Sequence, residues 1–173
     1  MCAQPHDYAT QLPVKHDLEE LVRVLNRHQV EYAVIGGTAM MFHGFPRATK
    51  DIDLLLPLSH ENNKKLHAAL AALPFNQEAL KELEIENLDK GFSTAVEGDI
   101  SIDILFVAND MTFERFREHL ERRDFNGCEV STLSLDGLIK SKETTRDTDK
   151  IDVAKLRRLR MALQQSSDGR SPK

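Results

Sequence analysis

The sequence is poor in the features that mark membrane proteins, secreted proteins and cysteine-based metal sites. No apolar run approaches the ~18 residues needed to cross a bilayer, and the amino-terminal segment lacks the charged-then-apolar pattern of a signal peptide. The two cysteines, Cys2 and Cys128, do not form a metal-binding pair. We therefore expect a cytoplasmic protein without membrane contact, in which both cysteines are reduced, unpaired thiols.

Histidine spacing and net charge disfavour two further kinds of site. The seven histidines show neither HxH nor HxxxH spacing on a shared face, so a zinc site is not expected. The net charge of −5 argues against a broad nucleic-acid surface. The segment "KIDVAKLRRLR" (150–160) is a local exception, with five basic residues and one acid. We interpret it first as a solvated helix face with cations near its carboxyl end.

What is present is typical of one globular domain. The 173 residues match the usual length of a single domain, and the composition, 40% hydrophobic and 29% charged, is that of an ordinary soluble protein. The chain shows no internal repeat and no interdomain linker. We predict a single domain spanning residues 1–173, with flexible segments at 1–15 and 166–173.

Hydrophobic periodicity predicts helices and strands in alternation. Helices are expected at 16–30, 38–44, 59–73, 111–123, 134–145 and 149–165, strands at 31–37, 48–57 and 128–134, and a hairpin at 92–107. The strand at 48–57 is apolar on both faces from Leu54 onward, which is typical of a central strand. The order predicts an α/β (α+β) protein with a mixed, mostly antiparallel sheet flanked by helices.

Two aspartates, Asp51 and Asp53, interrupt the apolar strand at 48–57. Strand side chains alternate between faces, so both carboxylates point to one side, with Cα atoms ~6.6–6.8 Å apart. In "ISIDILF" (100–106), Asp103 takes the face opposite the isoleucines and the phenylalanine. If that strand lies beside the first, Asp103 projects toward the other two. Asp99 is a rival third acid, but it belongs to the expected turn.

A cluster of three carboxylates is costly unless it has a use. At an effective dielectric of ~20, two carboxylates about 5 Å apart repel by about 3 kcal/mol. A cation relieves this repulsion, and Mg²⁺ suits hard oxygen ligands, with Mn²⁺ as an alternative ion. The chemistry indicated is phosphoryl or nucleotidyl transfer, in which metal ions stabilise the attacking and leaving oxygens.

A double glycine supplies candidates for holding phosphates. Gly36 and Gly37 lie between a strand and a short helix, where the missing side chains let backbone N–H groups approach phosphate oxygens. Thr38 adds a hydroxyl, and the cations Arg47 and Lys142 are candidates for neutralising phosphate charge. No GK[ST] or GxGxxG pattern is present, so this is not a Walker or dinucleotide-binding loop.

The segment "GGTAMMFHGFPRATKDIDLLL" (36–56) resembles the signature of the DNA-polymerase-β-like nucleotidyltransferase superfamily, a G-[GS] turn followed by a D-x-D strand. Its fuller form is similar to small bacterial members of the abortive-infection toxin type and to minimal nucleotidyltransferases. The closing "LIKSKETTRDTDKID" (138–152) is similar to their LI-x-x-K…R-x-K-D-x-x-D segment, with Lys142, Asp149 and Asp152 at matching positions and Thr148 where a lysine is usual. The resemblance covers residues 17 to about 160.

The resemblance implies a Mg²⁺-dependent nucleotidyltransferase of the EC 2.7.7 type. Such an enzyme moves a nucleoside monophosphate from an NTP, ATP included, onto an acceptor hydroxyl. By this comparison Asp51 and Asp53 are paired metal ligands, and Asp103 is the third carboxylate, able to help deprotonate the acceptor. The glycine turn with its threonine holds the triphosphate. The implied acceptor is an RNA or tRNA end or a protein, and the implied setting is a toxin–antitoxin or phage-defence pair with a cognate partner.

Other interpretations of the same residues stay open. The fold could serve as a non-catalytic nucleotide- or partner-binding module, such as an antitoxin component. The chain could also be an RNA-binding adaptor acting through residues 150–160, with RNA affinity indifferent to the aspartate pair. His43, at the end of the short helix, is expected to pack or cap rather than bind metal. Asp149 could cap the last helix, with Asp152 as its first-turn acid.

Overall fold

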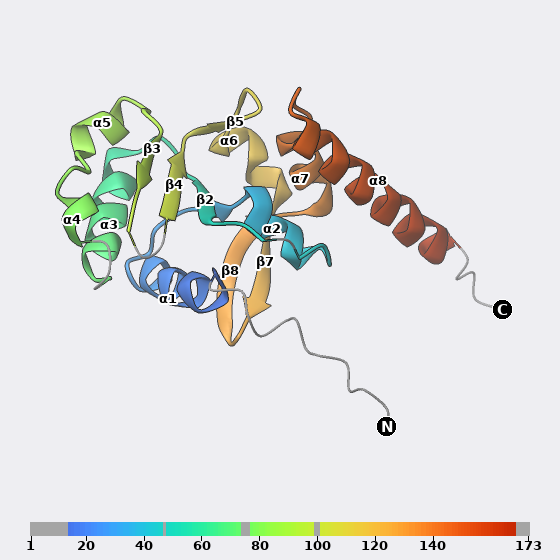
Figure 1. Cartoon of the computed structure of the whole chain (residues 1–173), viewed down its shortest axis with the longest axis horizontal. Coiled ribbons are helices and arrows are strands. Elements are labelled where there is room, and N and C mark those ends of the chain that lie inside the picture. The colour runs from blue at the N-terminus through green and yellow to red at the C-terminus, as the bar shows by residue number, and fades with distance from the viewer. Residues whose placement is uncertain (1–13, 47, 74–76, 99–100, 169–173) are drawn as a thin grey trace.

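The computed structural model describes residues 14–46, 48–73, 77–98 and 101–168 (Figure 1). Its helices are α1 (Val14–Arg27), α2 (Gly36–Phe42), α3 (His60–Ala71), α4 (Gln77–Leu80), α5 (Ile85–Asp89), α6 (Phe113–Phe116), the 3₁₀ turn η2 (Arg117–His119), α7 (Leu135–Ser141) and α8 (Asp147–Asp168). Its strands are β1 (Ala33–Val34), β2 (Asp51–Leu55), β3 (Thr94–Val96), β4 (Ser101–Leu105), β5 (Val107–Ala108), β6 (Met111–Thr112), β7 (Leu120–Phe125) and β8 (Cys128–Leu133).

In the described part of the chain, the main sheet has six strands in the order β3-β4-β2-β1-β8-β7. The pairs β3–β4, β1–β2 and β7–β8 are antiparallel, and β2–β4 and β1–β8 are parallel. The predicted mixed, mostly antiparallel sheet is therefore confirmed. So is the hairpin at 92–107, which the structure forms from β3 and β4.

Helices cover both faces of this sheet, as Figure 1 shows. One core contains side chains of α1, α3, α4 and α5, and the other contains side chains of α2, α6, α7 and α8. Leu54 and Leu55 are both fully buried, and they enter the two different cores. This confirms that β2 is a central strand, because its alternate side chains meet apolar layers on both sides.

In the first half of the chain, one helix begins and another ends at the residues that the sequence predicts. Ser59 caps α3, its hydroxyl accepting the N–H of Asn62 at 3.4 Å. After α2, Gly44 adopts φ +83° and its N–H bonds to the carbonyl of Met41, so the glycine ends the helix as expected.

The predicted helix at 111–123 is confirmed only over Phe113–Phe116: residues 111–112 form strand β6, and the prediction is also wrong beyond Phe116. The helical turn stops there, η2 follows, and the chain continues as β7, which pairs with β8. The turn between them is Asn126-Gly127, with φ of +55° and +78°, the positive values that a tight hairpin turn requires. Pairing across this turn outweighs the helical spacing of the apolar residues, so Leu120 lies opposite Leu133 in the sheet instead of on a helix face.

The terminal segments that we expect to be flexible fall only partly within the described residues. Residues 14–15 belong to α1 and residues 166–168 to α8, while 1–13 and 169–173 lie outside the described residues. Cys128 is a free thiol, as expected, and Cys2 also lies outside the described residues. Among the helices that the structure describes, we find none whose length and hydropathy would let it span a membrane.

Candidate active site

The structure brings two of the three predicted carboxylates directly opposite each other. Strands β2 and β4 run parallel with Asp53 paired to Asp103 and Asp51 paired to Ser101. The aspartates share their side of β2 with Leu55, which packs into the core of α7 and α8. The acidic face of the sheet is therefore the face that these two helices flank, with Asp51 exposed and the other two carboxylates half-buried.

The glycine turn closes around Asp53. Gly36 adopts φ +64°, and a Cβ added to it would lie 1.9 Å from Asp53 Oδ2. The next residue, Gly37, donates its backbone N–H to the same carboxylate. A residue with a side chain at 36 would meet both a strained backbone and a carboxylate oxygen, so only glycine allows Asp53 to sit against this turn.

Burial and mutual repulsion dominate the electrostatics of this face. Burial, followed by the charge of Asp103, raises the pKa of Asp53 to about 6, although Lys142 and the Gly37 amide oppose the rise. Burial and then the charges of Asp51 and Glu97 raise the pKa of Asp103 as well. Because each carboxylate makes its neighbour harder to ionise, the group favours a bound proton or cation.

Lys142 joins this face to the last helix. The side chain is only 3% exposed, and its Nζ donates to Asp152 Oδ2 at 2.9 Å and to Asp149 Oδ1 at 3.2 Å. Thr144 and Arg146 also donate to Asp149, each at 2.6 Å, and together with Lys142 they hold its pKa below its usual range despite burial. Asp149 therefore does more than cap α8, which begins two residues earlier.

The donor chemistry of the carboxylates fits a divalent cation, but the structure does not hold them in a closed metal cage. Among the described residues, no group of three or more His, Cys, Asp or Glu side chains is arranged to hold a metal ion as it stands. Asp53 is turned to the glycine corner, while Asp51 stays exposed. Repulsion between like charges keeps these carboxylates apart when no cation is bound. Their oxygens are hard ligands of the kind that Mg²⁺ prefers.

The other predicted phosphate-binding residues have mixed placements. Gly37 uses its N–H on Asp53, and Thr38 is buried with its hydroxyl donating to the carbonyl of Asp51 at 3.4 Å. Arg47 and the rival acid Asp99 lie outside the described residues. His43 packs as expected, because its buried Nε2 hydrogen-bonds to the carbonyl of Leu133 at 2.9 Å.

Two contributors to the site escaped the sequence analysis. Glu97 follows β3 and acts electrostatically on Asp103, and it accepts the hydroxyl of Ser101 at 3.3 Å. The hairpin register was the signal that could have found it, since residues opposite each other in β3 and β4 share a face. Arg146, which pairs with Asp149, is part of the matched R-x-K-D segment, but its role there depends on how α7 and α8 meet.

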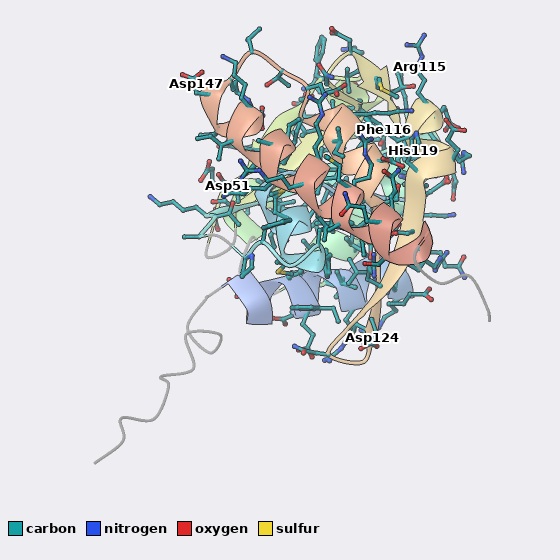
Figure 2. All side chains as sticks on the ribbon, turned by 90° about the vertical axis from the view of Figure 1, so that its right-hand side faces the viewer. Asp51, Arg115, Phe116, His119, Asp124 and Asp147 are labelled. Atoms are coloured by element: carbon teal, nitrogen blue, oxygen red, sulfur yellow. The ribbon has the colours of Figure 1, made fainter. Side chains whose placement is uncertain are left out.

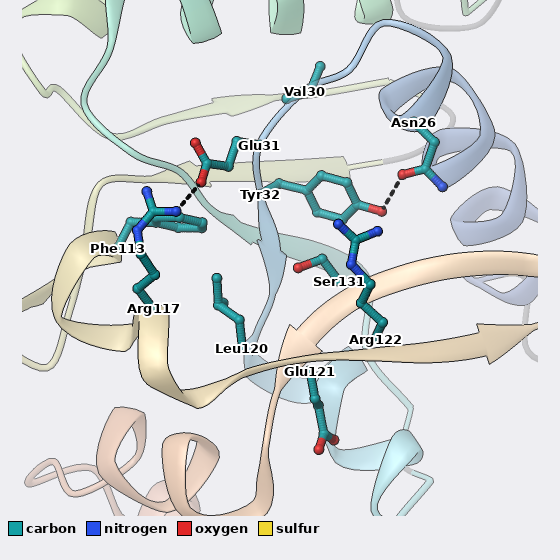
Figure 3. Close-up of a pocket in the computed structure, with 10 residues that line it drawn as sticks. All are labelled: Asn26, Val30, Glu31, Tyr32, Phe113, Arg117, Leu120, Glu121, Arg122 and Ser131. Carbon is teal, nitrogen blue, oxygen red and sulfur yellow. Dashed lines mark hydrogen bonds and ion pairs between the residues drawn. The ribbon is translucent and has the colours of Figure 1, made fainter.

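A separate cavity of about 290 Å³ lies at the other end of β1, beyond Val30 to Tyr32 (Figure 3). Two pairs of its polar groups are bonded to each other: Arg117 to Glu31 at 2.6 Å and the Tyr32 hydroxyl to Asn26 at 3.2 Å. Burial raises the pKa of Tyr32 to about 12, so its hydroxyl stays protonated. The candidate active site is therefore the carboxylate face and not this cavity.

Comparison with known proteins gives one family and one fold. A family model described as "Nucleotidyl transferase AbiEii toxin, Type IV TA system" matches residues 17–145. An antigenic nucleotidyltransferase-like protein from Paracoccidioides brasiliensis is similar in structure, with TM-score 0.53, 16% identity, and 91% of this chain and 88% of that one covered. A putative nucleotidyltransferase from Thermotoga maritima is similar with TM-score 0.53, 14% identity, and coverage of 92% and 99%. A search of curated proteins gave no significant match.

Proposed function

Because the chain belongs to the AbiEii nucleotidyltransferase toxin family, we propose that it transfers a nucleoside monophosphate from an NTP to an acceptor hydroxyl. The bond between the α-phosphorus and the acceptor oxygen forms, the bond to the β-phosphate breaks, and pyrophosphate leaves. The observation that carries this proposal is the register of Asp53 opposite Asp103, against the close turn at Gly36. A fold without a use for that arrangement would gain stability by losing it.

The carboxylates have complementary roles in this proposal. Asp51, Asp53 and Asp103 would hold Mg²⁺, with Mn²⁺ as the alternative, and such an ion stabilises charge on the attacking and leaving oxygens. Burial and the charges of Asp51 and Glu97 raise the pKa of Asp103, which suits it to take the proton of the acceptor hydroxyl. Asp53 is anchored to the glycine turn, and it would hold the ion beside α2.

Basic residues would orient the triphosphate in this proposal. A lysine ammonium has three N–H donors, and Lys142 uses two of them on Asp149 and Asp152. We propose its third donor for a phosphate oxygen, with Arg47 and the turn of Gly36 to Thr38 completing the set. The acceptor we propose is an RNA or tRNA end or a protein, and the setting a toxin paired with a cognate antitoxin.

Label transfer tests the catalytic proposal. The purified chain is incubated with each of the four α-labelled NTPs, Mg²⁺, and either total RNA or cell lysate. We expect label on one acceptor class, release of pyrophosphate, and loss of both in Asp103→Asn. No transfer from any of the four nucleotides, with folded wild-type protein, would contradict catalysis.

A non-catalytic binding module is the second candidate. It is favoured by the separation of the carboxylates, since no closed metal cage is found among the described residues. Thermal unfolding separates the two, because a ligand that binds only the folded state raises Tm. Stabilisation by Mg²⁺ with NTP, lost in Asp51→Asn, together with absent label transfer would favour the module. RNA affinity indifferent to Asp51 and Asp53 would instead favour an adaptor acting through 150–160.

A further inference from the structure

The last helix carries an apolar row that continues beyond the core. Val153 and Leu156 are 7% and 0% exposed, and Leu159 is half-buried. Leu163 follows at the same helical spacing, yet it is 54% exposed. Figure 1 shows why, since the carboxyl-terminal end of α8 extends away from the body of the protein. The inward face of α8 thus runs past the surface that it packs against.

Two hollows flank this exposed end of the row. One, of about 400 Å³, lies between α8, the start of α7, and side chains of α2 and β7, including Phe42. The other, of about 520 Å³, lies on the side of Arg160 and Gln164. Leu163, Leu135 and Asp136 line both, so the two hollows are adjacent along α8, and we refer to them together as the groove. Figure 2 shows α8 lying across this face of the molecule.

The carboxyl-terminal end of α8 is helical although little packing stabilises it. Residues 161–167 are all exposed. Isolated helical segments shorter than about 12–15 residues are marginal in water, and most helical stability in proteins comes from packing an apolar face. The helix is regular here, and its apolar residues continue the spacing of the buried row. This favours a segment that packs against a partner surface over one that stays exposed to solvent.

We propose that this groove is the interface with a second copy of this chain, with the two α8 helices packed against each other about a two-fold axis. The rim carries both signs of charge in equal number: Glu121 with Arg123 at 2.8 Å, and Asp136 with Arg160 at 3.0 Å. A two-fold interface places the same patch on both sides, so it must be complementary to itself. A lining with two acidic and two basic side chains meets that requirement, whereas an anionic partner would need a basic rim.

The dimer is expected to be weak. A standard stable interface buries about 800 Å² per partner, and a short apolar row with a charged rim offers a modest core. We therefore expect a dissociation constant in the micromolar range, which corresponds to about −8 kcal/mol or weaker. This association is independent of the transfer chemistry, because none of the groove residues belongs to the carboxylate face.

Sedimentation velocity of the full chain, from about 1 to about 100 µM, tests the proposal. We expect a monomer–dimer equilibrium that Leu163→Glu weakens at least tenfold. The matched control is Leu58→Glu, which alters an exposed leucine of similar accessibility, 60%, beside Gly91 on the other side of the sheet. It should dimerise like wild type.

Hydrogen exchange of the same samples gives a second measurement. Amides of residues 161–167 should become more protected as wild-type concentration rises, and they should not in Leu163→Glu. A monomer at every concentration overturns the proposal. So does a dimer that survives Leu163→Glu, or one that Leu58→Glu weakens equally.

Discussion

The charged side chains near the two ends of β1 have opposite kinds of neighbour: opposite charges at one end and like charges at the other. At the end before the strand, Arg117 bonds to Glu31 and to Glu114, so the charges around the cavity of Figure 3 are matched one against another. At the end after the strand, Asp53 and Asp103 face each other with like charge, and the nearby ammonium of Lys142 is already bonded to two other carboxylates. The charges at the first end are paired with opposite charges, whereas the carboxylates at the second end are repelled by like charges and favour a bound cation.

A cavity and a candidate active site therefore need not coincide. Polar groups that satisfy one another stabilise the fold modestly and leave no chemistry to perform. Groups that raise each other's pKa lower the stability of the unliganded protein and become useful when a ligand relieves them. The variants below test this difference, in order of decreasing expected effect.

Asp53→Asn should have the largest effect on transfer. We expect at least a ~1000-fold loss of label transfer, equivalent to about 4 kcal/mol of transition-state stabilisation. Stability should move the other way, since the amide removes a buried charge and its repulsion with Asp103. Urea unfolding at pH 7.5 without metal measures it. Wild-type activity in the variant, or a clear loss of its stability, would contradict the role proposed for this face.

Lys142→Met should destabilise the fold strongly. Removing the lysine takes away the ammonium that the buried Asp149 and Asp152 share, although Arg146 still pairs with Asp149, and breaking a buried pair costs about 3–5 kcal/mol. The matched control is Lys150→Met, whose pair with Asp147 at 2.8 Å is exposed and is expected to be worth less than about 1 kcal/mol. Equal urea midpoints for the two variants would show that the buried ion pair contributes no more stability than the exposed one.

Stability should fall as pH rises through the titration of Asp53. Its pKa of about 6 in the folded state lies above the unfolded value of 3.8, so between these values the folded protein binds more protons. The free energy of unfolding therefore decreases from about pH 4 to about pH 6, by up to about 3 kcal/mol for this group. The measurement is the wild-type pH profile minus that of Asp53→Asn. A difference that is flat or rises with pH would contradict the raised pKa.

Gly36→Ala tests the close turn, and Gly44→Ala is its control. Both glycines have positive φ, so each alanine carries the backbone cost of about 1–2 kcal/mol. A Cβ at 36 also displaces the Asp53 carboxylate, whereas one at 44 meets nothing within 4 Å. We expect about 100-fold slower transfer for Gly36→Ala alone. Similar activity in the two variants would mean that Asp53 does not depend on this turn.

Glu31→Gln should have the smallest effect. Its ion pair with Arg117 is exposed on both sides, and Arg117 keeps its bond to Glu114. We expect an unfolding midpoint close to wild type and unchanged label transfer. A loss of label transfer comparable to that of Asp53→Asn would place the active site at the cavity end of β1 instead of at the carboxylate face.

Much of the fold was accessible to sequence reasoning because its signals are local. The alternation of side chains along a strand is enough to put Asp51 and Asp53 on one side. A serine can cap a helix by accepting the free N–H three residues later, wherever the helix lies in the fold. The same reasoning failed at Leu120, where helical spacing competed with an Asn-Gly turn a few residues later. The turn prevailed because β8 was available for pairing, which is a property of the assembled sheet.

The sequence by itself determined the alternation of the aspartates, the glycines at the strand end, and the order of the elements through α3. These follow from side-chain direction and backbone sterics over a few residues. Only the tertiary structure decided that Asp103 stands opposite Asp53, that the charge of Lys142 acts on Asp53, and that α8 leaves Leu163 uncovered. The reason is physical: contacts between distant segments depend on which strands pair and how two cores fill, and no local pattern encodes that.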